Sequence, residues 1–503
     1  MKKLIGMLLA VVMLLSALAG TAMAEGKDTI TFAYETEPSS LFPTENDQIA
    51  SYYINYLLYS ALFKNTANGI EKDLCIDYRT ENDENGQPTV WILTLRQDAK
   101  FCDGTPLTAK DVVATYEFAK DRPSAKAKIS FMKSVEALDD FTIKLVTNGV
   151  YGSVPQALTA KQLNIQPAAL LAKGTDFDYD PVGSGPYKLV KWNKGENILM
   201  TANEYYYGEA PKIPNINWKF MSEGTSRTIA LEAGEVDFVI SVDALDLPRL
   251  QGNPDKYTVS ITNGSMFTYW RMNNTIAPFN DVNFRKFLSC AIDRDELVIV
   301  ALDGYGEPIT SLVNVNMPGF TTEGACDYDP EKAAEYLAAW GGDVSSLDIE
   351  IVVATDVRRR MAEVIVGNLA EYGIKAEVKM TESATVSTMA SNGEYQTMIF
   401  AYTTDDFIAF AKQLYYTGEG CNTGVLWMMG DETRQNQPIL DIQATLDADE
   451  KVAKITELNK LLNDIYSLVP IYCSKVLLGY NKDIGGVAVN AMGFFRVEDM
   501  YWK

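Results

Sequence analysis

The stretch from Asp180 to Asp237 constrains the fold of this chain more than any other. It begins with Pro-Val-Gly-Ser-Gly-Pro at residues 181–186, whose prolines and glycines favour a tight turn. Residues 187–192 then alternate well enough for a strand. A short helix is expected over residues 227–233, with Gly234 as its C-terminal cap. Because a strand follows the turn, without a Gly-Lys-Ser/Thr sequence, we interpret the glycines as structural and not as a phosphate site.

The composition narrows the class of protein. A chain of 503 residues is too long for one ordinary core and indicates two or three domains. Its 47% hydrophobic and 22% charged residues are typical of a soluble globular protein, and its net charge of -23 disfavours nucleic acid and anionic membranes as partners. The sequence contains no histidine, which excludes Ser-His-Asp and Cys-His catalysis and histidine-based metal or haem sites. We therefore expect no metal and no cofactor.

The N-terminus has the pattern of a secretory signal peptide. Lys2 and Lys3 precede an apolar stretch over residues 4–18, and Ala22-Met23-Ala24 fits the rule for cleavage after Ala24. A lipoprotein would carry a cysteine at the position of Thr21. We expect an exported mature protein, periplasmic or otherwise outside the cytoplasmic membrane, that is soluble and not lipid-anchored.

The six cysteines allow disulfides in an exported protein, although none lies in a Cys-x-x-Cys motif. Cys290 and Cys473 lie in apolar patterns and are interpreted as buried small side chains. Cys75 and Cys102 form the pair most worth testing, and the pairing as a whole stays open.

Three further motifs extend the pattern of the first stretch. They are Asn-x-x-Tyr at residues 203–206, Phe-x-Asp-Gly-x-Pro-Leu-Thr-Ala-x-Asp-Val at 101–112, and an Asn…Pro-Phe-x-Asp…Ala-Ile-Asp-Arg element ending at Arg294. With these motifs and Ala-Leu-x-x-Gly-Glu-Val-Asp at 230–237, the chain resembles the extracellular solute-binding protein family 5 over residues 28–503. This is the family of peptide- and oligopeptide-binding proteins of ATP-binding-cassette (ABC) importers.

The resemblance implies an α/β protein with the two-lobed periplasmic-binding-protein fold, type II or cluster C-like, and an extra small α+β domain inserted in the first lobe. The expected divisions are a signal peptide at 1–24, lobe I at 25–65, 181–268 and 476–503, the small domain at 66–180, and lobe II at 269–475.

Several local elements are expected from the residues themselves. Apolar spacing predicts a helix over 50–63 and a last long helix over 441–465. Thr108, with Asp111 three residues later, predicts an approximate capping box at a helix start. Residues 348–379 have the order strand, helix, strand of a βαβ unit.

The resemblance also implies where a ligand binds, because the family encloses it between the lobes. In peptide-binding members, an aspartate of a Trp-x-x-Asp motif after an apolar strand binds the α-ammonium group of the peptide. Here residues 398–401 form the strand, Tyr402 stands in place of the tryptophan, and Asp405 in place of the aspartate. We expect Asp405 to bind the ammonium group, with Asp406 as a rival and a solvated loop acid as the alternative.

Other ligand contacts are less sharply defined. The expected set around Asp405 and at the end of the first strand of lobe I consists of Ala401, Tyr402, Thr403, Thr404, Asn422, Tyr34 and Glu35. Arginines 358–360 open a helix on the same lobe, and an arginine would suit a peptide carboxylate, although a solvated helix face is the simpler interpretation. Trp427 is a further possible contact, but an apolar aromatic side chain is more often part of a core.

These observations predict a monomeric binding protein that takes up a solute, most simply short peptides, and delivers it to an ABC permease without catalysing a reaction. Oligosaccharides or metal chelates are alternative ligands within the same fold. An exported carboxylate-pair hydrolase is the alternative from another class, and a signalling receptor built on the same lobes is a third.

Overall fold

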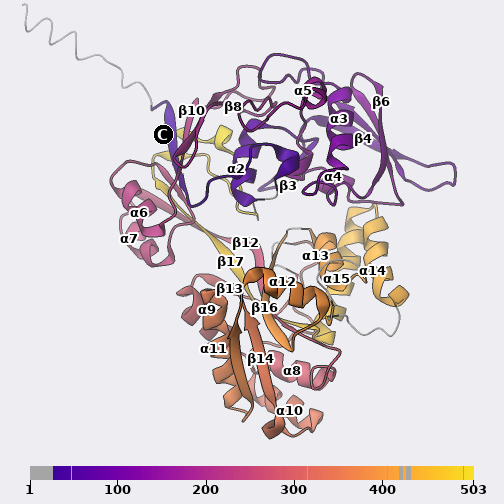
Figure 1. Ribbon diagram of the computed structural model, residues 1–503, viewed down its shortest axis with the longest axis vertical. Coiled ribbons are helices and arrows are strands. Elements are labelled where there is room, and N and C mark those ends of the chain that lie inside the picture. The colour runs from indigo at the N-terminus through magenta and orange to yellow at the C-terminus, as the bar shows by residue number, and fades with distance from the viewer. Residues whose placement is uncertain are drawn as a thin grey trace, which may run out of the picture.

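The computed structural model describes residues 27–503 apart from residues 47, 314, 316, 405, 418–422, 426–431 and 491. The expected signal peptide therefore lies outside the described residues, as do Asp405, Asn422, Cys421 and Trp427. Figure 1 shows two bodies stacked along the long axis, joined by the strands β12 and β17. In the part of the chain that the structure describes, no helix is long and apolar enough to span a membrane.

One mixed sheet of eleven strands runs through both bodies. Its order is β15 (Lys375–Met380), β14 (Asp348–Val353), β16 (Thr397–Thr403), β12 (Tyr257–Met272), β17 (Leu468–Asn481), β11 (Phe238–Ile240), β1 (Thr29–Tyr34), β10 (Asn215–Phe220), β9 (Asn197–Ala202) and β8 (Tyr187–Asn193), with β13 (Gly306–Pro308) paired to β17 beside this path.

The strands β12 and β17 cross from one body to the other. Residues 257–263 of β12 pair with 475–481 in the upper body of Figure 1, and residues 267–271 pair with 468–473 in the lower body. The register shifts between these two halves, so Gly264 lies in a bulge. A Cβ atom on Gly264 would lie only 2.8 Å from the Ser474 hydroxyl oxygen, so a glycine lets the two strands stay close at the bulge.

The described residues of the upper body form three cores. Around the large sheet, Phe32 stacks on Trp218 with ring centroids 4.9 Å apart, and Phe238 and Phe495 pack against it. The helices and short strands around this core are η2 (Pro43–Glu45), α2 (Ile49–Leu58), β18 (Ile484–Gly485), η6 (Val497–Asp499) and β19 (Tyr501–Trp502). On the opposite face of the sheet, α6 (Gly224–Glu232) and α7 (Leu247–Gln251), next to η4 (Ala244–Asp246), pack against Ala33 and Val239 in another core.

The third core belongs to residues 62–182 and is built on a separate four-stranded sheet. Its elements are β2 (Phe63–Thr66), β3 (Gly69–Lys72), β4 (Cys75–Glu81), β5 (Val90–Leu95), α3 (Ala109–Ala119), β6 (Met132–Asp139), β7 (Thr142–Thr147), α4 (Val154–Ala157), η3 (Lys161–Leu163) and α5 (Ala168–Lys173). The capping box of Thr108 and Asp111 at the start of α3 is confirmed.

In the lower body, the side chains of successive strand residues point to opposite faces of the sheet, so both faces carry apolar side chains. Helices cover both of these faces. Ile399 and Trp270 pack in the core under α8 (Val282–Cys290), α9 (Arg294–Leu302), α10 (Pro330–Trp340) and α11 (Asp356–Ala370), near η5 (Val344–Ser346). Phe267 and Tyr269 pack on the other face. This face is covered by α13 (Phe407–Tyr415), α14 (Glu432–Ala444) and α15 (Ala448–Ile465). On the same face, α12 (Ser383–Asn392) lies over Met398. The βαβ unit predicted over 348–379 is confirmed, because β14 and β15 are parallel and α11 joins them.

The turn at residues 181–186 is structural, as the sequence predicts, and it explains why the helix expected over 50–63 ends at Leu58. The chain passes directly over the end of α2, where the Gly185 amide donates to the Leu58 carbonyl at 3.0 Å. A Cβ atom on Gly183 would lie 2.0 Å from that same carbonyl oxygen. Only glycine allows this approach, and residues 63–66 are released to form β2.

Two other expectations are wrong. The long helix predicted over 441–465 consists of two helices, because Asp447 accepts a hydrogen bond from the Glu450 amide and starts α15 afresh. The pairing of Cys75 with Cys102 is also wrong: both thiols are free.

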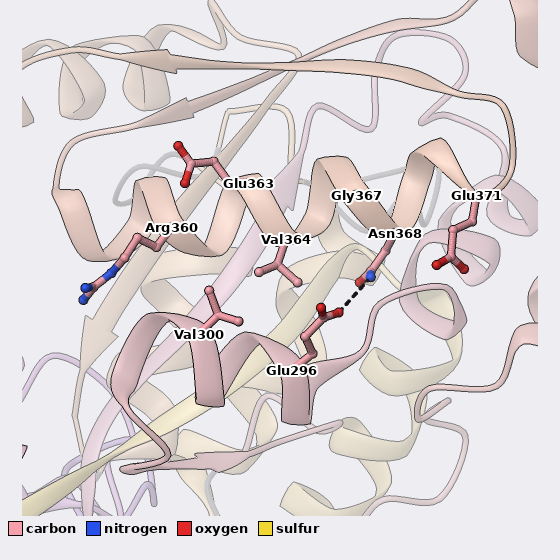
Figure 2. Close-up of a pocket in the computed structure, with 8 residues that line it drawn as sticks. All are labelled: Glu296, Val300, Arg360, Glu363, Val364, Gly367, Asn368 and Glu371. Carbon is pink, nitrogen blue, oxygen red and sulfur yellow. Dashed lines mark hydrogen bonds between the residues drawn. The ribbon is translucent and has the colours of Figure 1, made fainter.

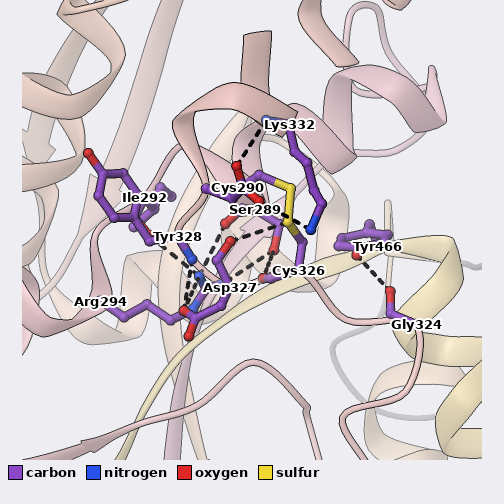
Figure 3. Close-up of a disulfide and its surroundings, with 11 residues drawn as sticks. Ser289, Cys290, Ile292, Arg294, Gly324, Cys326, Asp327, Tyr328, Lys332 and Tyr466 are labelled. Atoms are coloured by element: carbon purple, nitrogen blue, oxygen red, sulfur yellow. Dashed lines mark hydrogen bonds and ion pairs between the residues drawn. A yellow bond between two sulfur atoms is a disulfide. The ribbon is translucent and has the colours of Figure 1, made fainter. Parts of the chain in front are cut away.

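The disulfide that the structure contains joins Cys290, at the end of α8, to Cys326 (Figure 3). Cys290 is therefore buried, as expected, but it is not a simple apolar side chain. Beside it, the buried Arg294 guanidinium donates to the Pro470 carbonyl at 2.8 Å and lies 3.8 Å from the Asp327 carboxylate.

Candidate functional site

The carboxyl ends of two groups of strands point toward each other. In the upper body, β1 is parallel to β10 and β11, and β11 runs antiparallel to β17. In the lower body, β14 is parallel to β15 and β16, and β16 runs antiparallel to β12. Since β12 and β17 run in opposite directions, both groups end at the middle of this crossing pair. In open α/β sheets, ligands bind outside the carboxyl ends of the strands.

The end of β16 holds most of the predicted ligand contacts. Ala401, Tyr402 and Thr403 pair with residues 266–268 of β12, beside the bulge. Thr403 is exposed, whereas Thr404 is buried, with its amide donating to the Ser265 carbonyl at 3.3 Å and its hydroxyl accepting from the Asp406 amide at 3.0 Å. Thr404 therefore shapes the turn, and Thr403 is available at the strand end.

Asp406 has a clear structural role in the same turn. Its carboxylate accepts a hydrogen bond of 2.8 Å from the Ile408 amide and so caps the start of α13. Burial raises the pKa of Asp406, and the amides of Ile408 and Ala409 and the charge of Lys451 partly offset this rise. An acid already bound to a helix start and facing an internal lysine is a poorer acceptor for a ligand than a free acid would be.

The three arginines at the start of α11 differ from one another. Arg359 is partly exposed and pairs with Asp356 and Glu363, as a solvated helix face predicts. The Arg360 guanidinium donates to the Ala301 carbonyl at 2.8 Å.

Arg358 instead turns toward the sheet, and its guanidinium carbon lies 5.9 Å from the centre of the Phe400 ring. Burial lowers the pKa of Arg358, and the neighbouring Tyr472 and Tyr269 raise it. Among the described residues, no carboxylate lies within ion-pair distance of it. A half-buried guanidinium at the carboxyl ends of β14 and β16 can therefore bind an anionic group of a ligand.

The two residues predicted at the end of β1 have different surroundings. Tyr34 is buried in the core of the upper body, edge-on to Tyr53, and burial, together with the charge of Glu35, raises the pKa of Tyr34 to about 12. The Glu35 carboxylate is half exposed, 3.8 Å from the guanidinium of the buried Arg227. Sequence analysis missed Arg227, which donates to the Ser241 carbonyl at 2.7 Å and so connects the ends of β1 and β11.

The two bodies also touch through a contact that the sequence did not indicate, which we call the clasp. The Gly152 amide donates to the Gln443 carbonyl at 2.8 Å, and the Lys451 ammonium donates to the Ser153 hydroxyl at 2.5 Å. The Gly152 backbone lies directly on the Thr445 carbonyl. Figure 1 shows α14 and α15 reaching up to α4 here, away from β12 and β17. The clasp thus connects the small inserted domain to the helices beside Asp406.

A separate open groove of about 440 Å³ lies between α9 and α11 of the lower body (Figure 2). Its walls combine acidic and apolar side chains, and the Asn368 amide donates to the Glu296 carboxylate across it at 3.2 Å. Because its walls come from these two helices and from Glu371 at the end of α11, the groove is not the site between the bodies. Within the described ranges, no group of three Cys, Asp or Glu side chains could hold a metal ion.

Comparisons with known proteins agree with this geometry. The sequence profile of the bacterial extracellular solute-binding proteins, family 5 Middle, matches residues 77–422. The probable D,D-dipeptide-binding periplasmic protein DdpA of Escherichia coli (strain K12) is 23% identical, covering 93% of this chain and 92% of its own. The glutathione-binding protein GsiB of Salmonella paratyphi A (strain ATCC 9150 / SARB42) is 24% identical, covering 98% of both chains.

Among solved structures, HbpA2 from Haemophilus parasuis superposes with a TM-score of 0.84 at 22% identity, covering 94% of this chain and all of its own. This likeness shows that the described fold is that of a two-lobed periplasmic binding protein.

Proposed function

Because this chain belongs to the bacterial extracellular solute-binding proteins of family 5, we propose that it binds short peptides between its two lobes and delivers them to the permease of an ABC importer. The names of the similar proteins DdpA and GsiB support a peptide ligand, since they specify D,D-dipeptides and glutathione. Family members are substrate-binding proteins and not enzymes, so we further propose that the chain makes and breaks no bond.

The observation that carries the peptide proposal is the half-buried guanidinium of Arg358 at the carboxyl ends of the lobe II strands. A free peptide has an ammonium group at one end and a carboxylate at the other. The half-buried guanidinium of Arg358 has no carboxylate partner among the described residues and suits the peptide carboxylate. Because Asp406 caps α13, we assign the ammonium group to its neighbour Asp405, which lies outside the described residues. Each such charged hydrogen bond contributes roughly 1.5–3 kcal/mol.

In this proposal the lobes keep the boundaries expected from the sequence, and closure occurs about the bulge at Gly264, where β12 and β17 cross. The ligand shifts an equilibrium between open and closed forms, and the permease recognises the closed form. The clasp between Gly152 and α14–α15 closes the side away from the crossing strands.

The first experiment is a thermal-shift screen of the ligand-stripped mature protein against di- to octapeptides, oligosaccharides and metal chelates. A ligand at about a hundred times its Kd stabilises the folded protein by roughly 2.7 kcal/mol. A response limited to peptides supports the proposal. A response to sugars or chelates alone would keep the fold and the transport role but replace the ligand. Turnover of a peptide or glycan would favour the hydrolase.

The two proposed ends of the peptide are tested separately. Asp405→Asn should weaken binding of a free-amine peptide by about 10–100-fold, and much less that of its N-acetylated form. Arg358→Met should do the same for a free carboxylate compared with a C-terminal amide. Arg359→Met is the matched control, because Arg359 lies in the first turn of the same helix but already pairs with Asp356 and Glu363. Equal losses for blocked and free peptides would remove both assignments.

A further inference from the structure

A small polar cavity of about 50 Å³ lies in the upper body, where three distant parts of the chain meet. Lys161 and Asp73 come from the small inserted domain, Tyr207 from the loop before β10, and Glu498 and Arg496 from the C-terminal segment. None of these residues belongs to the proposed peptide site.

The two carboxylates that line the cavity already have partners. Asp73 accepts a hydrogen bond of 2.6 Å from the Tyr207 hydroxyl and lies 4.0 Å from the Lys64 ammonium. Glu498 accepts a hydrogen bond of 2.9 Å from the Arg496 guanidinium. Their need for donors and positive charge is therefore largely met without Lys161.

Of the described groups in the lining, the Lys161 ammonium is the charged one that lacks a hydrogen-bond acceptor and an opposite charge. The residue is only 7% exposed, and its ammonium lies over the ring of Tyr56, 2.8 Å from the ring centre. Among the described residues, it makes no hydrogen bond and has no carboxylate within 4.0 Å. An ammonium group carries three donors, and the face of a ring replaces only part of their hydration. Burial lowers the pKa of Lys161, and the charges of Asp73 and Glu498 raise it.

The charge without a partner at the cavity is a cation, which favours an anionic ligand. Of the three basic side chains that line it, Lys64 lies 4.0 Å from Asp73. Arg496 pairs with Glu498 and also with Asp499, 3.2 Å away and outside the lining. Among the described residues, this leaves Lys161 as the basic group of the lining with no carboxylate within 4.0 Å. A buried charge is costly unless it is paired, and the volume exceeds the roughly 10–15 Å³ that holds one water molecule.

We propose that this cavity is a binding site for a small monovalent anion of halide size, held by the Lys161 ammonium. The anion supplies the acceptor and the opposite charge that the Lys161 ammonium lacks. Because the lining comes from the small domain, lobe I and the C-terminal segment together, a bound anion stabilises their junction. This site does not depend on the identity of the transported solute.

The test compares thermal unfolding of the full mature protein in sodium bromide and in sodium gluconate at equal ionic strength. At ten times its Kd, bromide should raise the Tm of the wild type by about 1–2 °C over gluconate. Lys161→Met should abolish this difference, whereas Lys126→Met, which changes an exposed lysine of the same domain, should retain it. Crystals of the wild type grown in bromide should show an anomalous peak in contact with the Lys161 ammonium.

The diffraction experiment on wild-type crystals tests the proposal even if Lys161→Met does not fold. Equal Tm values in bromide and gluconate, without an anomalous peak at Lys161, would overturn the proposal in favour of a water-filled cavity. A bromide effect of the same size in Lys161→Met would overturn it too, because the halide would then act elsewhere. No peptide enters either measurement, so a failure here is distinct from a failure of the proposed transport function.

Discussion

Replacing Gly152 with alanine should weaken ligand binding without unfolding the protein. The added Cβ would lie 2.0 Å from the Thr445 carbonyl oxygen, whereas real Cβ atoms essentially never approach closer than 3.0 Å. The clasp must therefore open by about 1 Å, and no positive φ makes alanine unfavourable at this position. Opening the clasp breaks two hydrogen bonds: the one from the Gly152 amide to the Gln443 carbonyl, and the charged one from the Lys451 ammonium to the Ser153 hydroxyl. Together these contribute about 2–3 kcal/mol, which corresponds to a Kd raised roughly 30–150-fold.

Isothermal titration with a ligand identified in the thermal-shift screen measures this effect. Gly149→Ala is the matched control, because it lies three residues away and its Cβ would meet no atom within 4 Å. Without ligand, both variants should unfold with the wild-type free energy to within about 0.5 kcal/mol. If Gly152→Ala binds the ligand as tightly as Gly149→Ala, the clasp does not form on closure and the reasoning fails.

Three further predictions concern stability. Gly183→Ala should lower the free energy of unfolding, measured in urea, by about 2–3 kcal/mol, because it disrupts the hydrogen-bonded crossing over α2. Gly367→Ala is the control: Gly367 lies inside α11 with open space around it, so alanine there should raise the free energy of unfolding by about 1 kcal/mol. Replacing Cys290 and Cys326 with serine opens a disulfide across 36 residues and should cost about 4 kcal/mol in the same assay; an unchanged midpoint would argue against the bond. For Asp406 the folded-state pKa is raised by burial, so the contribution of this carboxyl to stability falls as pH rises above the ordinary aspartate value of about 4. Asp406→Asn keeps the helix cap, and its stability relative to the wild type should increase as pH rises above about 4; a pH-independent difference would contradict this.

Local patterns in the sequence were sufficient for many elements. The capping box at Thr108, the βαβ unit over 348–379 and the strand expected over 398–401, which lies within β16, are all confirmed, because each depends on neighbours within a few residues or on one periodic pattern. The glycine turn at 181–186 was also interpreted correctly as structural. Its partner, the end of α2, lies more than a hundred residues away and could not be identified from spacing, so the end of that helix was misplaced.

In the candidate site too, the sequence predicted the local elements but not the contacts between distant segments. The resemblance to the family indicated the end of β16 as the ligand position, and the register of β16 on β12 places that end beside the crossing strands. Sequence alone did not separate Arg358 from Arg359, because consecutive helix residues differ in surroundings by their direction around the axis. It also left Asp406 as a rival acid, since its hydrogen bond to the Ile408 amide exists only once α13 has formed.

By itself, the sequence determined the family, many of the strand and helix segments and the absence of histidine chemistry, because periodicity, turn residues and composition are properties of the chain. Only the tertiary structure decided the disulfide between Cys290 and Cys326, the clasp at Gly152 and the buried ammonium of Lys161. Each of these depends on segments that are far apart in the chain and lie within a few ångströms of one another in the fold. Such contacts leave no local pattern, since the free energy that selects them comes from packing and desolvation across the whole molecule.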